Sequence, residues 1–218
     1  MNAWPITSCG LRLDDEAIRV AVGLRLGSNL CMPHECPCGA LVDARGSHGL
    51  SCRRSAGRLP RHSMLNDLVR RALVRAGVPA TLEPLGLLRN DGKRPDGCTG
   101  VPWSAGKCLT WDVTVSDTLA ASHLPHTSIM AGAAAERAKE EKYQDITRTH
   151  DFVAIALETL GPICEGGSAF LDELGRLLVL KTGDPREKAF LYQRLSIAIQ
   201  RCNALSFAGS FTVETFSR

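Results

Sequence analysis

Hydrophobic and polar residues alternate most clearly over residues 110–115, which read TWDVTV. In a strand, this period places Trp111, Val113 and Val115 on one side and Asp112 on the other. The pattern therefore predicts a strand that packs its apolar side on a core and presents Asp112 to an open site.

A shorter β-type run precedes this strand within residues 92–115, and a turn region rich in Gly, Pro and Ser separates the two. Its acid is Asp96, directly after Pro95. If the runs pair antiparallel, Asp96 and Asp112 come together at one lip of the sheet. Two converging carboxylates predict a Mg²⁺ site, because hard oxygen ligands suit this ion. The alternative is that Asp96 is a turn residue and Asp112 an exposed strand residue.

The rest of the chain alternates between helical periodicity and short apolar runs. Helices are predicted over residues 14–26, 62–77, 129–148, 168–178 and 186–205. The near-continuous apolar run at 152–157 predicts a strand buried on both faces. Residues 80–88 predict an earlier strand at an edge or a bulge, because Pro84 cannot donate to a ladder. The resulting order of helix, three strands, helix and strand predicts an α/β (α+β) fold.

Nine cysteines and six histidines are the compositional feature that needs an explanation. The first residues show no basic region followed by an apolar one, so no secretory signal is visible. No apolar run approaches the length of a membrane span, so no membrane partner is expected. In an intracellular, reducing compartment, clustered cysteines favour a metal site over disulfides.

Four soft or borderline ligands lie close together in the sequence. They are Cys36, Cys38, His48 and Cys52. This spacing fits a tetrahedral Cys₃His zinc site, and four protein ligands predict a structural role because no coordination position stays open. Cys31 and His34 lie just upstream and compete as ligands, so the choice of four remains open. The alternative is a group of reduced, buried cysteines with a surface histidine.

Basic residues gather in two places, although the net charge of +3 is only mildly basic. Residues 53–61 form a basic, turn-rich linker, and two cations directly precede Pro95. Cations beside a carboxylate-metal site suit a phosphate backbone. The candidate phosphate-contacting residues are Arg53, Arg54, Arg58, Arg61, Lys93 and Arg94. A solvated charge run explains the linker equally well.

Arg94-Pro95-Asp96, followed after fifteen residues by Asp112 in an apolar strand, resembles the PD-(D/E)XK motif of restriction-like endonucleases. Together with the preceding Cys/His knuckle, residues 30–160 resemble the restriction-like endonuclease of one class of non-LTR retrotransposon reverse transcriptases. The resemblance implies a restriction-endonuclease-like core, Mg²⁺-dependent nicking of DNA and a nuclear location. It also implies that the knuckle binds single-stranded nucleic acid, RNA included.

The sequence departs from that motif at one position. Thr114 stands where the family's lysine is expected, two residues after the second acid. In related families the lysine sometimes moves to the following helix, which makes Lys139 and Lys142 the candidates, with no choice between them. Ordinary charge pairing on that helix explains both lysines equally well. Glu83 is a candidate third carboxylate, although exposed strand glutamates are common.

Histidines supply two weaker candidates. The resemblance places the first helix of the core beside the site, where His62 and Asn66 share a face; the ordinary interpretation is a capping histidine and a surface asparagine. His123 and His126 have a metal-binding spacing but lie in a loop without a third partner.

The predicted organisation has four segments: an N-terminal helix region (1–30), the knuckle (31–58), the core (59–160) and a C-terminal helical extension (161–218). Two other functions compete with the endonuclease. One is a nucleic-acid-binding module without catalysis, which Thr114 favours. The other is an inert relic, against which the intact acids and zinc ligands argue.

Overall fold

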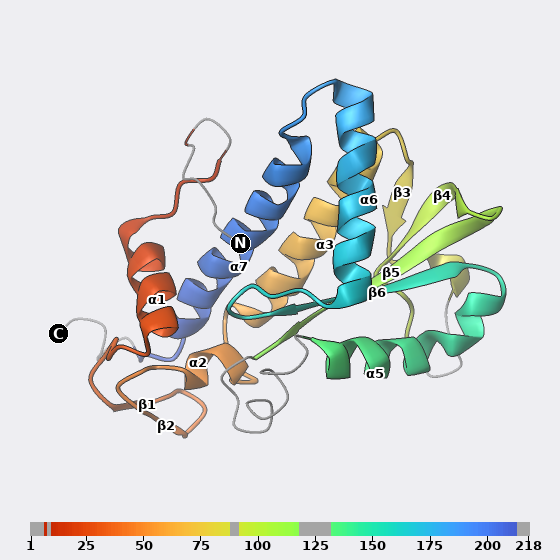
Figure 1. The fold of residues 1–218 in the computed structure, drawn as a ribbon. Helices are drawn as coiled ribbons and strands as arrows, with labels where there is room; N and C mark the ends of the chain where they lie inside the picture. The colour runs from red at the N-terminus through yellow and green to blue at the C-terminus, as the bar shows by residue number, and fades with distance from the viewer. Residues whose placement is uncertain (1–6, 8–9, 88–91, 118–131, 213–218) are drawn as a thin grey trace.

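A computed structural model describes residue 7 and residues 10–87, 92–117 and 132–212. Its centre is a four-stranded mixed sheet with the strand order β3-β4-β5-β6 (Figure 1). The strands are β3 (Ala80–Leu82), β4 (Gly97–Ser104), β5 (Lys107–Ser116) and β6 (Asp151–Glu158). Neighbouring strands are antiparallel from β3 to β5, and β5 and β6 are parallel. The fold is therefore mixed α/β, as the sequence predicted.

The predicted hairpin consists of β4 and β5. Its turn residues Ala105 and Gly106 have φ angles of 45° and 78°. A two-residue turn with positive φ at both positions matches the natural twist of the two strands. The register pairs Gly97 with Trp111. Asp96 therefore lies where β4 begins, next to the part of β5 that carries Asp112.

The main hydrophobic core lies on one face of the sheet. Trp111 and Val113 reach it from β5, and the helices α3 (Arg58–Arg75), α6 (Glu165–Thr182) and α7 (Glu187–Ala208) cover it. The helix α5 (Ala133–Tyr143) lies on the opposite side of the sheet from α6 and α7 (Figure 1). Because Asp112 alternates with Trp111 and Val113, its side chain lies on the α5 face.

The connection from β5 to β6 contains α5 and the 3₁₀ helix η3 (Gln144–Arg148). The predicted long helix thus continues from α5 into a tighter final turn. β6 runs parallel to β5 with Asp112 opposite Ala154, so the predicted return to the same sheet is confirmed. The predicted helix start at 129–131, together with His123 and His126, lies outside the described residues.

The predicted strand over residues 80–88 is mostly wrong, because β3 ends at Leu82. Glu83 has a φ of 49°, which leaves the extended conformation, and Pro84 follows directly. Residues Leu85–Leu87 form a 3₁₀ turn, η2. The positive φ of Glu83, together with the missing N–H of Pro84, thus ends the strand early.

Helix boundaries follow local chemistry. In α1 (Asp15–Leu26), the Asp14 carboxylate accepts a hydrogen bond of 2.7 Å from the Ala17 amide, as an N-cap should. The helix α3 starts at Arg58 rather than at residue 62, so it includes part of the predicted linker. The α6 and α7 helices are both longer than predicted. None of the helices that the structure describes combines the length and apolar character that a membrane crossing requires.

A second, smaller core joins the N-terminal part of the chain to the end of α7. Its buried members are Ala17, Val20, Leu24, Leu50, Ala204 and Phe207. The knuckle segment, with β1 (His34–Glu35), β2 (Leu41–Val42) and α2 (His48–Ser51), lies against this core. A Cβ at Gly49 would lie 2.6 Å from the Ser206 carbonyl oxygen, so the knuckle backbone touches α7 directly. The knuckle is thus docked on the helical layer.

Candidate functional site

The Cys/His cluster brings together the four predicted ligands. The ligand atoms of Cys36, Cys38, His48 and Cys52 all lie within 4.8 Å of one another, and no other group of three or more such ligands occurs among the described residues. Cys38 Sγ lies 3.3 Å from His48 Nε2, and Cys36 Sγ lies 3.9 Å from Cys52 Sγ. The cluster could bind a metal such as zinc, for which three thiolates and one imidazole are a standard ligand set.

A tight turn between the first two ligands makes this geometry possible. Gly39 adopts a φ of 87°, and its amide donates to the Cys36 carbonyl at 2.7 Å. The Cys36 amide in turn donates to the Ala40 carbonyl at 2.9 Å. Only glycine adopts such a φ without strain. The backbone therefore folds both thiols to one side.

The two thiols of this turn differ in acidity. Burial raises the pKa of the Cys36 thiol to about 11. A hydrogen bond from the Ala40 backbone amide lowers the pKa of the Cys38 thiol to about 7. A metal ligand must be a thiolate, so Cys38 is the thiol most ready to bind a metal at neutral pH.

The upstream competitors have other partners. Cys31 Sγ donates to the carbonyl oxygens of Asp43 at 3.5 Å and Ala44 at 3.6 Å. His34 hydrogen-bonds through Nε2 to the Ser210 carbonyl at 3.1 Å, and its ring stacks on Phe211. Neither belongs to the cluster, so the structure resolves the ligand choice that the sequence left open. His34 instead ties β1 to the segment after α7.

Asp96 lies at the start of β4 and receives three hydrogen-bonding groups at one oxygen. Its Oδ2 accepts from the Val113 amide at 2.7 Å and from Asn66 Nδ2 at 3.1 Å, and it lies 3.0 Å from His62 Nε2. Burial alone would raise the pKa of Asp96, but the interactions with His62, Val113 and Asn66 hold it below its ordinary value. The same hydrogen bond to Asp96 raises the pKa of His62.

Asp112 is buried at 2% exposure in the middle of β5. Its Oδ1 lies against the Lys139 ammonium, and its Oδ2 lies 3.8 Å from Lys142 Nζ. From the described part of the chain, Oδ1 receives no hydrogen bond of ordinary geometry, and the charge of Lys139 lies beside it. The helix α5 thus places both of its lysines beside Asp112.

Asp96 lies beside the part of β5 that carries Asp112. Asp96 donates its amide to the Trp111 carbonyl at 2.9 Å and accepts from the Val113 amide, so its contacts bracket Asp112. The charges of Asp112 and Lys139 also act on His62, which contacts Asp96. Both acids, one lysine and one histidine therefore share one electrostatic environment.

Glu83 does not join this group. Its side chain is 68% exposed and forms an ion pair with Arg94. The positive φ of Glu83 turns the chain away from the ladder, although its amide still donates to the Asp96 carbonyl at 2.8 Å. The prediction of a third carboxylate at Glu83 therefore stays a prediction, and the pairing of Glu83 engages one of the predicted phosphate-binding cations.

The end of α5 is tethered to the strand segment that precedes Asp96. Tyr143 Oη donates to the Arg94 carbonyl at 2.8 Å and receives a hydrogen bond of 2.7 Å from Lys142 Nζ. Lys142 is therefore partly committed to Tyr143, whereas Lys139 contacts Asp112 directly. Lys139 is therefore the lysine that lies closer to Asp112.

The basic residues fall into two groups. Arg53, Arg54 and Arg58 are exposed, and Arg54 Nη1 donates to the Pro37 carbonyl of the knuckle at 3.1 Å. Arg61 is 5% exposed on α3, and burial lowers its pKa. The prediction that Arg61 contacts phosphate is therefore wrong, because α3 starts early and turns this residue inward.

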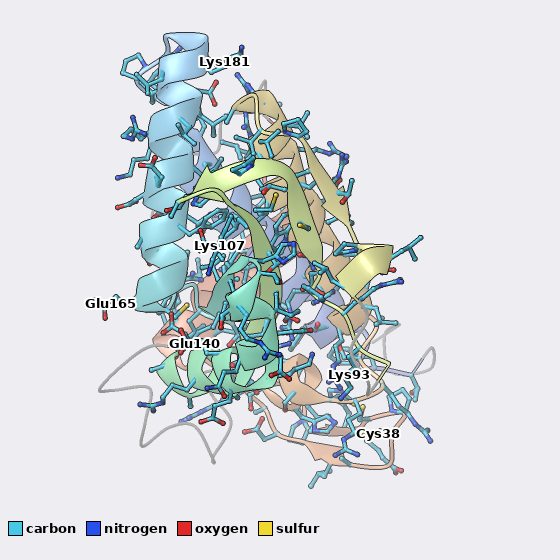
Figure 2. All side chains as sticks on the ribbon, turned by 90° about the vertical axis from the view of Figure 1, so that its right-hand side faces the viewer. Cys38, Lys93, Lys107, Glu140, Glu165 and Lys181 are labelled. Carbon is cyan, nitrogen blue, oxygen red and sulfur yellow. The ribbon has the colours of Figure 1, made fainter. Side chains whose placement is uncertain are left out.

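Lys93 is exposed on the segment that leads into β4. Its side chain and that of Cys38 are drawn close together in Figure 2 only in projection, because the knuckle strands β1 and β2 lie at the opposite end of the molecule from β4 in Figure 1.

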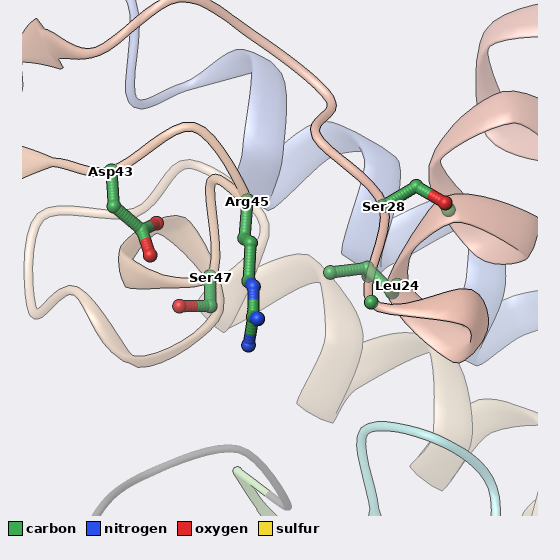
Figure 3. Close-up of a pocket in the computed structure, with 7 residues that line it drawn as sticks. Leu24, Ser28, Asp43, Arg45 and Ser47 are labelled. Atoms are coloured by element: carbon green, nitrogen blue, oxygen red, sulfur yellow. The ribbon is translucent and has the colours of Figure 1, made fainter.

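A pocket lined by neither Asp96 nor Asp112 lies between the end of α1 and the knuckle (Figure 3). Its volume is about 180 Å³, and its lining includes Leu24, Ser28, Asp43, Arg45 and Ser47. None of the predicted site residues lines it.

Sequence reasoning did not find how Asn66, Trp111 and Tyr143 cooperate around Asp96. One signal was present, because a buried tryptophan needs a partner for its indole N–H. Trp111 Nε1 donates to Asn66 Oδ1 at 3.0 Å.

No protein-family model and no curated protein sequence matches this chain, so its function has to be inferred from this geometry.

Proposed function

We propose that this protein is a metal-dependent endonuclease domain that nicks phosphodiester bonds in DNA and has a restriction-endonuclease-like core. One observation carries the proposal: Asp96 accepts a hydrogen bond from the amide of Val113, the residue after Asp112, and Lys139 reaches Asp112 from α5. The order of α3, three strands, α5 and β6 supports the fold assignment. The proposal also includes an origin in a retrotransposon polyprotein and a nuclear location.

The residues fit a hard divalent cation such as Mg²⁺. Asp96 and Asp112 both offer carboxylate oxygens, the ligand type that Mg²⁺ prefers. Among the described residues, no donor contacts Asp96 Oδ1, which leaves that oxygen available. When bound, the ion would supply Lewis-acid polarisation of the phosphodiester and a more acidic water.

The protein's own groups then provide charge and orientation. Lys139 compensates the buried Asp112 carboxylate and places a cation where charge develops on a phosphate during cleavage. Asp96 is kept ionised by its depressed pKa, so it is ready to bind a cation at neutral pH. Tyr143 fixes the end of α5 to the Arg94 backbone and so holds the lysines at the strand.

Exposed cations around the acids would bind the nucleic-acid backbone. Lys93 precedes Asp96, and Arg53, Arg54 and Arg58 follow the knuckle. Such contacts hold DNA largely without reading bases. The zinc-loaded knuckle would add a platform for single-stranded DNA or RNA.

Nicking of supercoiled plasmid in the presence of Mg²⁺ or Mn²⁺ tests the proposal. Wild type should convert the plasmid to the open circle, and Asp96→Ala and Asp112→Ala should lower the rate at least about 100-fold while DNA binding persists. Asp145→Ala is the matched control, because Asp145 is an exposed acid on η3 at 92% exposure. Loss of nicking in the control, or equal nicking by all variants, would show that Asp96 and Asp112 do not carry the activity.

A second candidate function is a nucleic-acid-binding module without catalysis. The specific observation in its favour is that protein cations already neutralise both acids, Asp96 with His62 and Asp112 with Lys139. If wild type and both acid variants bind DNA equally and none of them cuts it, this second function is the correct one.

A further inference from the structure

We infer that Asn66 is a positioning residue that, together with Trp111, orients the Asp96 carboxylate and leaves one of its oxygens for a divalent cation. This inference rests on the proposed function and adds a residue outside the acid and lysine set. Asn66 is 4% exposed and lies on α3, whereas Trp111 is fully buried on β5. The amide therefore bridges a helix, a core strand and the acid at the start of β4.

The chemistry of the three groups fixes the orientation of the amide. The Trp111 indole is only a donor, and an ionised Asp96 carboxylate is only an acceptor. Asn66 Oδ1 accepts from Trp111 Nε1 at 3.0 Å, and Asn66 Nδ2 donates to Asp96 Oδ2 at 3.1 Å. A flipped amide would set donor against donor and acceptor against acceptor. A neutral side chain with both groups at this length is therefore required at this position.

Trp111 restrains Asp96 by two further routes. Its backbone carbonyl accepts from the Asp96 amide at 2.9 Å. Its ring also passes under the next residue, since a Cβ at Gly97 would lie 2.0 Å from Trp111 Cζ2. Only glycine leaves room for the ring there. The backbone and the carboxylate of Asp96 are thus both set by one core tryptophan.

The consequence is an asymmetric carboxylate. Oδ2 is used by the Val113 amide, Asn66 and His62. Among the described residues, no donor reaches Oδ1. An asparagine that fixes this asymmetry leaves a single oxygen for a cation, in the way that second partners of metal ligands orient their carboxylates.

The test compares Asn66→Leu with Asn203→Leu in the full-length, zinc-loaded protein. Asn203 is also a fully buried helical asparagine, and its Nδ2 donates to the Thr159 carbonyl at 2.7 Å, on α7 and outside the site. Mn²⁺ binding is measured directly by electron paramagnetic resonance of the free ion. We expect Asn66→Leu to weaken Mn²⁺ binding about 10- to 100-fold, the scale for loss of an outer partner of a metal ligand, and Asn203→Leu to leave it unchanged.

Trp111→Phe keeps the inference testable if Asn66→Leu does not fold. This variant removes the indole donor and should weaken Mn²⁺ binding in the same direction by a smaller factor, without a change in the KM for DNA. Folded variants that bind Mn²⁺ as tightly as wild type would overturn the inference and leave Asn66 as a core hydrogen-bonding residue.

A second readout separates this inference from the proposed function. If wild type neither binds Mn²⁺ nor nicks DNA, the proposed function fails, and hydrogen exchange at Val113 decides the positioning role. Loss of Asn66 should accelerate exchange of the Val113 amide, which donates to Asp96 Oδ2, relative to Ile155 in the same sheet. Equal exchange in wild type and Asn66→Leu would show that Asn66 does not position the carboxylate.

Discussion

The knuckle and the acidic lip assemble their ligands in opposite ways. All four knuckle ligands come from residues 36–52, and their ligand atoms already lie within 4.8 Å of one another. The acidic lip, defined here as Asp96, Asp112, His62 and Lys139, draws on α3, the start of β4, β5 and α5. One group is formed by a local turn, whereas the other requires the whole sheet and its helices.

The two regions also differ in the groups that lie beside their thiols and carboxylates. The knuckle thiols interact mainly with one another, with backbone amides and with His48. In the acidic lip, each carboxylate has a protein cation beside it. A metal at the knuckle would therefore bind ligands that are already close together, whereas a metal at the lip would have to compete with existing ion pairs.

The largest effect is expected from the knuckle. Cys52→Ser should abolish stoichiometric zinc and remove much of a metal contribution that is about 10 kcal/mol or more in isolated zinc-binding peptides. Because the knuckle packs on α1 and the end of α7, thermal unfolding should shift to a markedly lower temperature. Metal analysis and calorimetry check this. Cys31→Ser is the control and should keep one zinc per chain; loss of zinc there would mean that the ligand set is different.

Removal of the lysine beside Asp112 should have the next largest effect. Lys139→Ala leaves a carboxylate that is 2% exposed without its nearest cation, which should destabilise the protein by about 1–3 kcal/mol, below the value for a fully buried pair. Mg²⁺ should raise the free energy of unfolding of Lys139→Ala by more than it raises that of wild type. Lys142→Ala, at 3.8 Å from Asp112, should show less than half the effect. Equal effects of the two variants in urea denaturation would contradict the assignment of Lys139.

The His62–Asp96 pair predicts a pH dependence of stability in metal-free buffer. The pKa of His62 is raised, so its contribution is complete below about pH 6.5 and is lost as the pH rises through the folded-state pKa. The pKa of Asp96 is lowered, so its contribution is present above about pH 4 and is lost as the pH falls through the depressed value.

Urea denaturation at pH 5.5 and 8.5 measures this difference. The free energy of unfolding of wild type should fall by less than about 1 kcal/mol from the lower to the higher pH, because His62 is 47% exposed and its pairing is screened by solvent. His62→Gln should remove that loss, while His150→Gln should retain it. A His62→Gln profile that matches wild type would show that the pair does not contribute to the pH dependence.

The smallest effect is expected from single exposed arginines. Arg54→Ala should lower the slope of log K against log salt for DNA binding by about one, as expected for one phosphate contact. Arg176→Ala removes an exposed arginine of α6 and should leave the slope unchanged. Fluorescence anisotropy at several salt concentrations measures both. If the two variants have the same slope as wild type, Arg54 is only a solvated charge.

The sequence was most informative where neighbours in the chain are neighbours in space. The spacing of Cys36, Cys38, His48 and Cys52 predicted the cluster, and alternation around Trp111 predicted β5 and its inward face. Only the choice between these ligands and the upstream pair needed coordinates, because both sets lie within reach of one turn.

The misses share a physical cause, which is that tertiary packing decides them. Residues 53–61 were predicted to be a turn-rich linker, but the proline within them, Pro60, is tolerated in a first helical turn, where its missing N–H has no partner to lose. The α3 helix therefore starts at Arg58 and buries Arg61. For Asn66 the sequence left a place beside the site and a surface position both open, because nothing local shows that Trp111, 45 positions away in the chain, needs its amide oxygen.

Anomalous diffraction from crystals soaked in Mn²⁺ tests most directly whether Asp96 and Asp112 together hold a divalent cation beside Lys139. We expect a manganese peak that contacts Asp96 Oδ1 and one carboxylate oxygen of Asp112. Density that shows no manganese there, with Asp96 still bound to His62 and Asp112 still bound to Lys139, would contradict it.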